Sequence, residues 1–325
     1  QVQCIAYSND KGRTWSKYKG NPVIGDRRDI VGSSNIRDPK VFRHDQTHQW
    51  IMVLFEATGL SIFNSANLKD WQYKSHVKGF WECPELFELP VDGDPDRKKW
   101  VMYGASGTYM IGDFDGETFT MQSGKHPYHQ SVMYAAQTYN NSPDDRRIQI
   151  GWGRVAAPDM PFNQMMTFPT QLSLRTTHQG IRLFSEPVQE IENLHVKKYH
   201  WQNLTIEGKA FQLPEPVTDE LLHIKAEFEI HLARRFGIRI HGYTIKYDLK
   251  DNLLNDAFVS PVDHKIYLDI LVDRNSIEIF ANHGRFYLAE AYNSVDQPKH
   301  IELFSRNGTT KVTNLEIYPL KSIWK

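Results

Sequence analysis

RDPKVFRHDQTHQWIMV, residues 37–53, joins an acid and a proline to a strand, a polar hairpin turn and a second strand. The same plan returns in ECPELFELPVDGDPDRKKWVMY, residues 82–103. A third hairpin of similar plan links residues 133–138 to residues 147–152, so the copies open near residues 38, 82 and 134. Because a period of about 40 to 50 residues is typical of propeller blades, the first half of the chain is predicted to be a β-propeller.

A second repeat runs in phase with the first. It consists of a strand end, a polar turn and an aromatic residue, and its anchors are Trp15, Trp71 and, in a weaker copy, Phe119. These anchors are 56 and 48 residues apart, which again indicates one unit per propeller blade.

The second half of the chain shows β-structure without the blade repeat. Apolar residues alternate with polar ones in residues 236–240, 243–247 and 268–272, and turn signals such as Asn282-His283-Gly284 lie between such stretches. No apolar helical pattern holds for several turns. We therefore predict an all-β protein with a propeller domain in residues 1–190 and an antiparallel β-sandwich in residues 191–325.

Composition excludes several kinds of partner. Lys and Arg total 38 against 39 Asp and Glu, a net charge of −1, which predicts no nucleic-acid partner and no anionic membrane. No stretch approaches the roughly 20 apolar residues of a transmembrane helix. The two cysteines, Cys4 and Cys83, are too few for a disulfide scaffold and wrongly spaced for zinc, and no metal or cofactor is predicted.

Two carboxylates are predicted to meet in the propeller. The first strand of each blade lines the central channel, so Asp38 and Glu82 are expected to face one axial pocket. Such a pair can hydrolyse a glycosidic bond. Glu82 is the better proton donor, since Trp81 and Cys83 would desolvate it and raise its pKa. The alternative is a structural Glu with a basic partner.

Asp38 differs from Glu82 in its sequence neighbours. The adjacent Arg37 guanidinium favours an ionised carboxylate that accepts hydrogen bonds from sugar hydroxyls as positive charge develops on the ring. The alternative is an ordinary Asp-Pro turn at the start of a strand.

These residues add up to a resemblance. Residues 35–41, NIRDPKV, resemble the RDP motif, and residues 81–84, WECP, the EC motif, of the β-fructosidases of glycoside hydrolase family 32: levanases, invertases and inulinases. Further similar segments follow in order along nearly the whole chain: residues 7–23, 134–138 with 151–152, 166–172 and, in the second domain, 269–284.

The resemblance implies a five-bladed β-propeller followed by a β-sandwich, and hydrolysis of β-linked fructose with retention of configuration. It makes Glu82 the general acid/base and Asp38 the transition-state stabiliser, with Arg37 holding both carboxylates and substrate in register. Cys83 and Trp152 would line the pocket. Their alternatives are a small buried hydrophobe and a blade-packing tryptophan.

The chain departs from the family pattern in one respect. The nucleophile of the family is the Asp of a WMNDPNG-like motif in the first blade, and nothing in this sequence resembles that motif. The first blade and the start of the second are expected to be missing from these residues. Because a retaining enzyme needs that carboxylate, the 325-residue chain alone is predicted to be inactive or nearly so.

The expected substrates are fructans (levan or inulin) or sucrose. Alternatives are a non-catalytic fructan-binding protein, a fructosyltransferase, and the neighbouring arabinan-acting propeller family, which Glu82-Cys83 and residues 269–280 fit less well. Polymer degradation makes a secreted or periplasmic location the expectation.

Overall fold

The computed structural model describes residues 1–129, 132–157, 160–292 and 299–323. Nearly all of its regular structure is β-strand, so the all-β prediction is confirmed. The chain divides into two compact units that interleave in sequence. The propeller unit comprises Gln1–Pro127, Tyr134–Arg147 and Ser173–Ile181, and the sandwich unit comprises Tyr128–Met133, Ile148–Leu172 and Arg182–Lys325.

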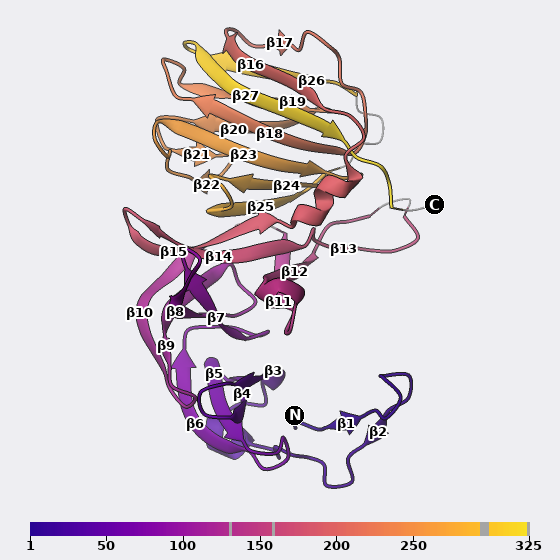
Figure 1. The fold of residues 1–325 in the computed structure, drawn as a ribbon, viewed down its shortest axis with the longest axis vertical. Coiled ribbons are helices and arrows are strands. Elements are labelled where there is room, and N and C mark those ends of the chain that lie inside the picture. The colour runs from indigo at the N-terminus through magenta and orange to yellow at the C-terminus, as the bar shows by residue number, and fades with distance from the viewer. Residues whose placement is uncertain (130–131, 158–159, 293–298, 324–325) are drawn as a thin grey trace. The chain divides into compact units, whose positions relative to one another are not determined.

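The propeller unit contains two antiparallel four-stranded meanders (Figure 1). Its first elements are the paired β1 (Ala6–Tyr7) and β2 (Ser16–Lys17) and the short α1 (Arg28–Val31). The first meander is β3 (Ile36–His44), β4 (Gln49–Glu56), β5 (Gly59–Ser65) and β6 (Gln72–Lys78). The second is β7 (Glu85–Val91), β8 (Asp94–Tyr103), β9 (Thr108–Phe114) and β10 (Phe119–Pro127). The predicted copies at residues 38 and 82 thus each open a four-stranded meander; the first is a sheet of its own, and the second is part of a nine-stranded sheet.

The aromatic anchors of the second sequence repeat close polar turns. The indole Nε1 of Trp15 donates to the carbonyl of Gly12 at 2.9 Å, and that of Trp71 to the carbonyl of Leu68 at 3.0 Å. In both turns, therefore, the tryptophan indole donates a hydrogen bond to the carbonyl of the residue three positions before it. Phe119 has no such donor and is buried at the start of β10.

The next elements run through both units. They are β11 (Met133–Thr138), the 3₁₀ turn η1 (Pro143–Asp145), β12 (Arg147–Gly153), β13 (Met165–Met166), β14 (Thr170–Thr177), β15 (Gly180–Pro187) and the 3₁₀ helix η2 (Gln189–Leu194). Within the propeller unit, β14 pairs with β7 in parallel at Leu174 and Val91. Within the sandwich unit, β13 pairs with β12 at Met166 and Trp152.

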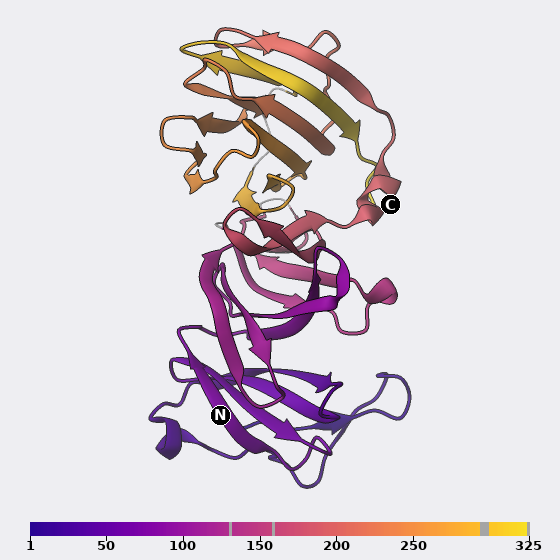
Figure 2. The same ribbon diagram turned by 60° about the vertical axis from the view of Figure 1, so that its left-hand side comes forward.

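Two six-stranded sheets form most of the sandwich unit, and Figure 2 shows them in a second view. One has the order β16 (Tyr199–Ile206), β27 (Thr310–Pro319), β18 (Leu222–Glu229), β23 (Lys265–Val272), β24 (Ser276–Ala281) and β25 (Phe286–Ala291). The other has the order β17 (Phe211–Gln212), β26 (Ile301–Arg306), β19 (Arg235–Ile240), β20 (Tyr243–Asp248), β21 (Leu253–Leu254) and β22 (Ala257–Phe258).

The alternation in the sequence explains how these sheets pack. In β18, Ile224, Ala226 and Phe228 are buried while Lys225 and Glu227 are only partly so. Buried side chains from both sheets form one cluster, which is the core of the sandwich. The strands predicted at residues 236–240, 243–247 and 268–272 correspond to β19, β20 and the end of β23.

One fully buried carboxyl group lies within the sandwich unit. Glu278 in β24 accepts hydrogen bonds from the backbone N–H of Phe168 at 3.0 Å and from the hydroxyl of Tyr287 at 2.6 Å. Burial outweighs both hydrogen bonds and raises the pKa of Glu278 from 4.5 to about 7.

This shift predicts a pH-dependent stability. Between about pH 4.5 and 7 the folded chain holds a proton on Glu278 that the unfolded chain releases, so the free energy of unfolding falls as the pH rises. The expected fall is about 3 kcal/mol across this window. Denaturant unfolding of the chain, measured at several pH values, gives the free energy of unfolding of the sandwich unit. This free energy should depend less on pH in Glu278→Gln than in the wild type. An unchanged pH slope in this variant would contradict the assignment.

Candidate active site

The backbone turns sharply at the residues that open the two meanders. Asp38 lies in β3 at a bulge, because the pairing of β3 with β4 shifts register between Arg37 and Lys40. Asp38, Glu82 and Cys83 have φ values of 61°, 47° and 42°. Non-glycine residues seldom occupy this left-handed region, and they concentrate at functional sites. Here the turns bring the predicted Asp38 and Glu82 to the same guanidinium.

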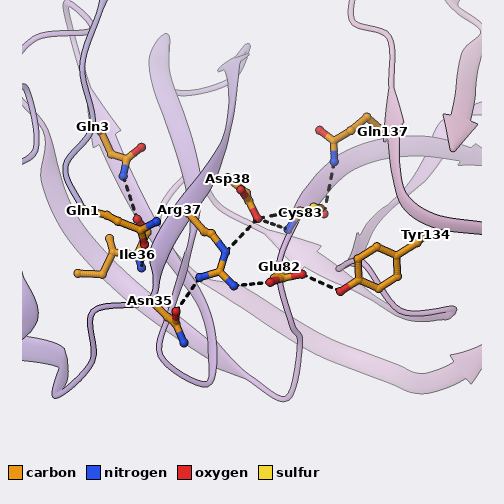
Figure 3. A network of polar contacts seen from close by, with 10 residues as sticks. All are labelled: Gln1, Gln3, Asn35, Ile36, Arg37, Asp38, Glu82, Cys83, Tyr134 and Gln137. Carbon is orange, nitrogen blue, oxygen red and sulfur yellow. Dashed lines mark hydrogen bonds and ion pairs between the residues drawn. The ribbon is translucent and has the colours of Figure 1, made fainter. Parts of the chain in front are cut away.

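Arg37 is the centre of this cluster (Figure 3). Its Nη1 donates to Oδ1 of Asn35 at 2.7 Å, its Nη2 donates to Oε1 of Glu82, and its Nε lies 3.9 Å from Oδ2 of Asp38. The guanidinium also lies 5.3 Å from the ring centre of Phe55. Arg37 thus contacts both carboxylates, and its role in holding them and the substrate in register stays a prediction.

Asp38 is tied to the second meander through Cys83. The backbone N–H of Cys83 donates to Oδ2 of Asp38 at 3.2 Å, and the Sγ of Cys83 lies 3.6 Å from the same oxygen. Gln137 in turn donates to the carbonyl of Cys83 at 3.3 Å. The side chain of Asp38 remains 33% exposed, so it can accept further hydrogen bonds from a ligand.

Cys83 supplies a backbone donor to this cluster and no thiolate. Burial, with the negative charge of Asp38 as the next cause, raises the pKa of the thiol to about 12. The thiol therefore stays protonated near neutral pH, which is compatible with the alternative role of Cys83 as a small buried hydrophobe.

Glu82 is held at both oxygens. Arg37 donates to Oε1, and the hydroxyl of Tyr134 donates to Oε2 at 2.7 Å. The backbone leading to it is packed closely: a Cβ on Gly104 would lie 2.7 Å from the carbonyl oxygen of Trp81 and 3.0 Å from that of Glu82. Only glycine fits at position 104 beside this turn.

The expected rise in the pKa of Glu82 is wrong. The hydrogen bonds from Tyr134 and then from Arg37 favour the carboxylate and lower the pKa, while the opposing effect of burial is smaller. Trp81, whose ring is 45% exposed and packs against Phe55 with centroids 4.9 Å apart, also acts against the expected rise, because its side chain hydrogen-bonds to the carboxylate and lowers the pKa.

Sequence reasoning missed three contributors: Asn35, Tyr134 and Gln137. Tyr134 and Gln137 lie at the third predicted blade opening, near residue 134, and this position was the available signal. Asn35 lies two residues before Arg37 and orients its guanidinium.

Trp152 lies in β12, within the sandwich unit. It is 41% exposed, and its indole Nε1 donates to the side chain of Gln164. Its predicted place in the pocket wall stays a prediction. Within the described ranges, no group of three or more His, Cys, Asp or Glu side chains is arranged to hold a metal ion. No helix among the described residues is long and apolar enough to cross a membrane.

Comparisons with known proteins match this arrangement to one family. Residues 1–187 match the model of the glycosyl hydrolases family 32 N-terminal domain, and residues 244–319 match that of the glycosyl hydrolases family 32 C-terminal domain. The chain belongs to glycosyl hydrolase family 32. This confirms the resemblance carried by the RDP and EC motifs.

Several family 32 relatives align with the whole chain. A levanase from Bacillus subtilis is 36% identical over 100% of this chain and 55% of its own length. An extracellular exo-inulinase from Aspergillus ficuum is 28% identical over 100% of this chain and 72% of its own length. The chain thus spans about half of the Bacillus levanase that it matches.

Solved family 32 structures share the fold. The exo-inulinase from Aspergillus awamori superposes with a TM-score of 0.87 at 26% identity, covering 100% of this chain and 75% of its own. A fructofuranosidase from Schwanniomyces occidentalis complexed with fructosylnystose gives 0.83 at 25% identity, covering 99% and 76%. The predicted class, a β-propeller domain followed by a β-sandwich, is confirmed.

Proposed function

We propose that this chain carries the general acid/base and the transition-state stabiliser of a retaining glycoside hydrolase that releases fructose from β-fructosides: levan, inulin or sucrose. The observation that supports this most is the contact of Arg37 with both Glu82 and Asp38. The names of the relatives, levanase, exo-inulinase and fructofuranosidase, support the substrate class.

In the first half of the proposed reaction, protonated Glu82 gives its proton to the glycosidic oxygen as the bond from that oxygen to the fructosyl carbon breaks. Positive charge develops on the ring at the same time. Asp38, fixed by Arg37 and the N–H of Cys83, accepts hydrogen bonds from the fructosyl hydroxyls and stabilises that charge.

A third carboxylate attacks the fructosyl carbon in this first half and forms the covalent intermediate. We propose that it is supplied from outside residues 1–325, because the sequence has no counterpart of the nucleophile motif of the family. In the second half, water attacks the intermediate and gives its proton to the Glu82 carboxylate, which releases fructose and restores the acid. The lowered pKa of Glu82 favours this second role.

The hydrogen bond from Tyr134 predicts a pH effect. The first half of the reaction needs protonated Glu82, so kcat/KM falls as the pH rises through its pKa. Tyr134→Phe removes the main cause of the lowered pKa, so the basic limb of the kcat/KM profile should move to higher pH. Loss of the hydrogen bond should also reduce kcat at the optimum by about tenfold or less. Tyr139→Phe, at an exposed position of the same segment, is the control and should leave the profile unchanged.

A basic limb that stays in place in Tyr134→Phe would show that this hydroxyl does not set the pKa of the catalytic acid. A basic limb of the kcat/KM profile that moves to lower pH would likewise show that this hydroxyl does not lower the pKa of the catalytic acid.

Fructose release from levan, inulin and sucrose tests the function itself. It is measured for the 325-residue chain and for the protein carrying its natural N-terminus. Release confined to the second form supports the proposal. Wild-type activity from the 325-residue chain would overturn the assignment of the nucleophile. Binding of fructan by both forms without release would instead support the fructan-binding alternative, and fructosyl transfer to sugar would support the transferase.

Location follows from the substrate. Fructans are polymers, and the relatives include extracellular exo-inulinases, so we propose that the protein acts after secretion. Detection of the activity in culture medium rather than in cell lysate tests this.

A further inference from the structure

A second carboxylate, that of the residue directly after the EC motif, is fully buried. Glu85 is the first residue of β7, three residues after Glu82, and its side chain is 0% exposed. Its Oε1 lies 2.7 Å from Nζ of Lys40 and accepts from the backbone N–H of Thr138 at 3.0 Å. Its Oε2 accepts from the hydroxyl of Thr138 at 2.7 Å.

These partners lie on the same three segments that carry the site above. Lys40 follows Asp38 by two residues in β3, and Thr138 follows Tyr134 by four residues in β11. Nζ of Lys40 also donates to the carbonyl of Thr138 at 2.8 Å. Glu85, Lys40 and Thr138, called here the buried layer, therefore join every pair of the three segments.

Stability alone does not explain the charges in this layer. Burying an ion pair costs desolvation, and apolar residues of similar volume often serve stability as well or better. The pKa of Glu85 remains raised by burial although Lys40 and Thr138 oppose the rise. Arg147 adds a second cation beside the layer, with Nη1 3.4 Å from Oγ1 of Thr138.

The residues with strained backbone on these three segments indicate which conformations the buried layer can hold in place. Asp38, Glu82, Cys83 and also Ala135 have positive φ values. Such conformations persist only where the surroundings determine them strongly. Every one of these residues lies within three positions of a member of the buried layer.

We infer that Glu85, with Lys40 and Thr138, is a positioning residue of the proposed reaction. The contacts among these three residues set the orientation of Glu82 and Asp38. Glu85 touches no substrate in this account. The inference rests on the proposed function, and a misplacement of a reacting group by about 1 Å is enough to reduce a rate by about 10²-fold.

Glu85→Gln tests this inference, because it keeps the shape and removes the charge. In the protein with its natural N-terminus, kcat should fall by about tenfold to a hundredfold with KM changed less than about threefold. Glu302→Gln is the matched control: this buried carboxylate pairs with Arg239 within the sandwich unit, so its loss should lower thermal stability and leave kcat unchanged.

A second readout is independent of activity. The pKa of the Glu82 carboxyl, measured by NMR of 13C-labelled glutamate in the 325-residue chain, should rise in Glu85→Gln and stay constant in Glu302→Gln. It would rise because a reoriented Glu82 loses the hydrogen bonds from Tyr134 and Arg37 that lower the pKa.

Thr138→Val replaces Glu85→Gln if the latter does not fold. It removes the hydroxyl that donates to Oε2 of Glu85 and that accepts from Arg147, keeps the backbone N–H donor to Glu85, and should shift both readouts in the same direction by less. A folded variant that keeps both the wild-type kcat and the wild-type pKa of Glu82 overturns the inference. A wild-type protein that releases no fructose refutes the proposed function, and the NMR measurement then still decides whether the layer orients Glu82.

Discussion

Glu82→Gln is expected to reduce kcat for fructose release by about 10²- to 10⁴-fold, the range supplied by a general acid/base. The amide has no proton to give to the leaving oxygen and cannot accept one from water. Its carbonyl oxygen can still accept from Tyr134, so the variant should fold normally. Steady-state kinetics on levan, inulin and sucrose in the protein with its natural N-terminus measure the effect.

The control for this variant is Glu88→Gln. Glu88 lies on β7, six residues after Glu82. Its Oε2 lies 3.5 Å from Nζ of Lys98, and it has no contact with Arg37 or Tyr134 among the contacts described. It should keep wild-type kcat. A Glu82→Gln protein that retains kcat within tenfold of wild type would remove Glu82 from the chemistry.

Asp38→Asn is expected to lower kcat/KM by about 10²- to 10³-fold, comparable to the loss of one preorganised electrostatic group. An Asn side chain can still accept the N–H of Cys83, so the turn should persist. What is lost is the negative charge facing the developing positive charge and the stronger bonds that it makes to sugar hydroxyls. The loss should therefore appear in kcat and also in KM.

Asp45→Asn, at the exposed turn that follows β3, is the matched control and should have no effect on either constant. Fructose release by Asp38→Asn at the wild-type kcat/KM would show that Asp38 is only an Asp-Pro turn residue, the alternative considered from its sequence.

The convergence of Asp38 and Glu82 could be predicted because the spacing of the blades places equivalent strand openings side by side. The spacing could not predict the local backbone conformation at these openings. The bulge after Arg37 and the left-handed turns at Glu82 and Cys83 depend on contacts made across the meanders. These turns decide which atoms of Asp38 and Glu82 reach Arg37.

The direction of the pKa shift of Glu82 was mispredicted for a related reason. The sequence neighbour Trp81 does reach the carboxylate, but through a side-chain hydrogen bond that lowers the pKa, and the two main causes of the shift lie elsewhere in the chain. Its partners, Arg37 and Tyr134, lie 45 and 52 residues away along the chain, and both donate to it.

Glu85 shows the opposite case. The sequence predicts no role for Glu85, and glutamates are seldom fully buried. In the fold it is fully buried, since Lys40 and Thr138 neutralise and satisfy it from two other segments. No single stretch of the sequence contains that information.

The most direct test of the account follows the sugar itself. Proton NMR during the first moments of levan hydrolysis, by the protein with its natural N-terminus, reads both the release of fructose and its anomeric configuration. We expect β-fructofuranose to appear first and to equilibrate later, because formation and hydrolysis of a covalent intermediate each invert the anomeric carbon. The α-anomer as first product, or the absence of released fructose, would contradict it.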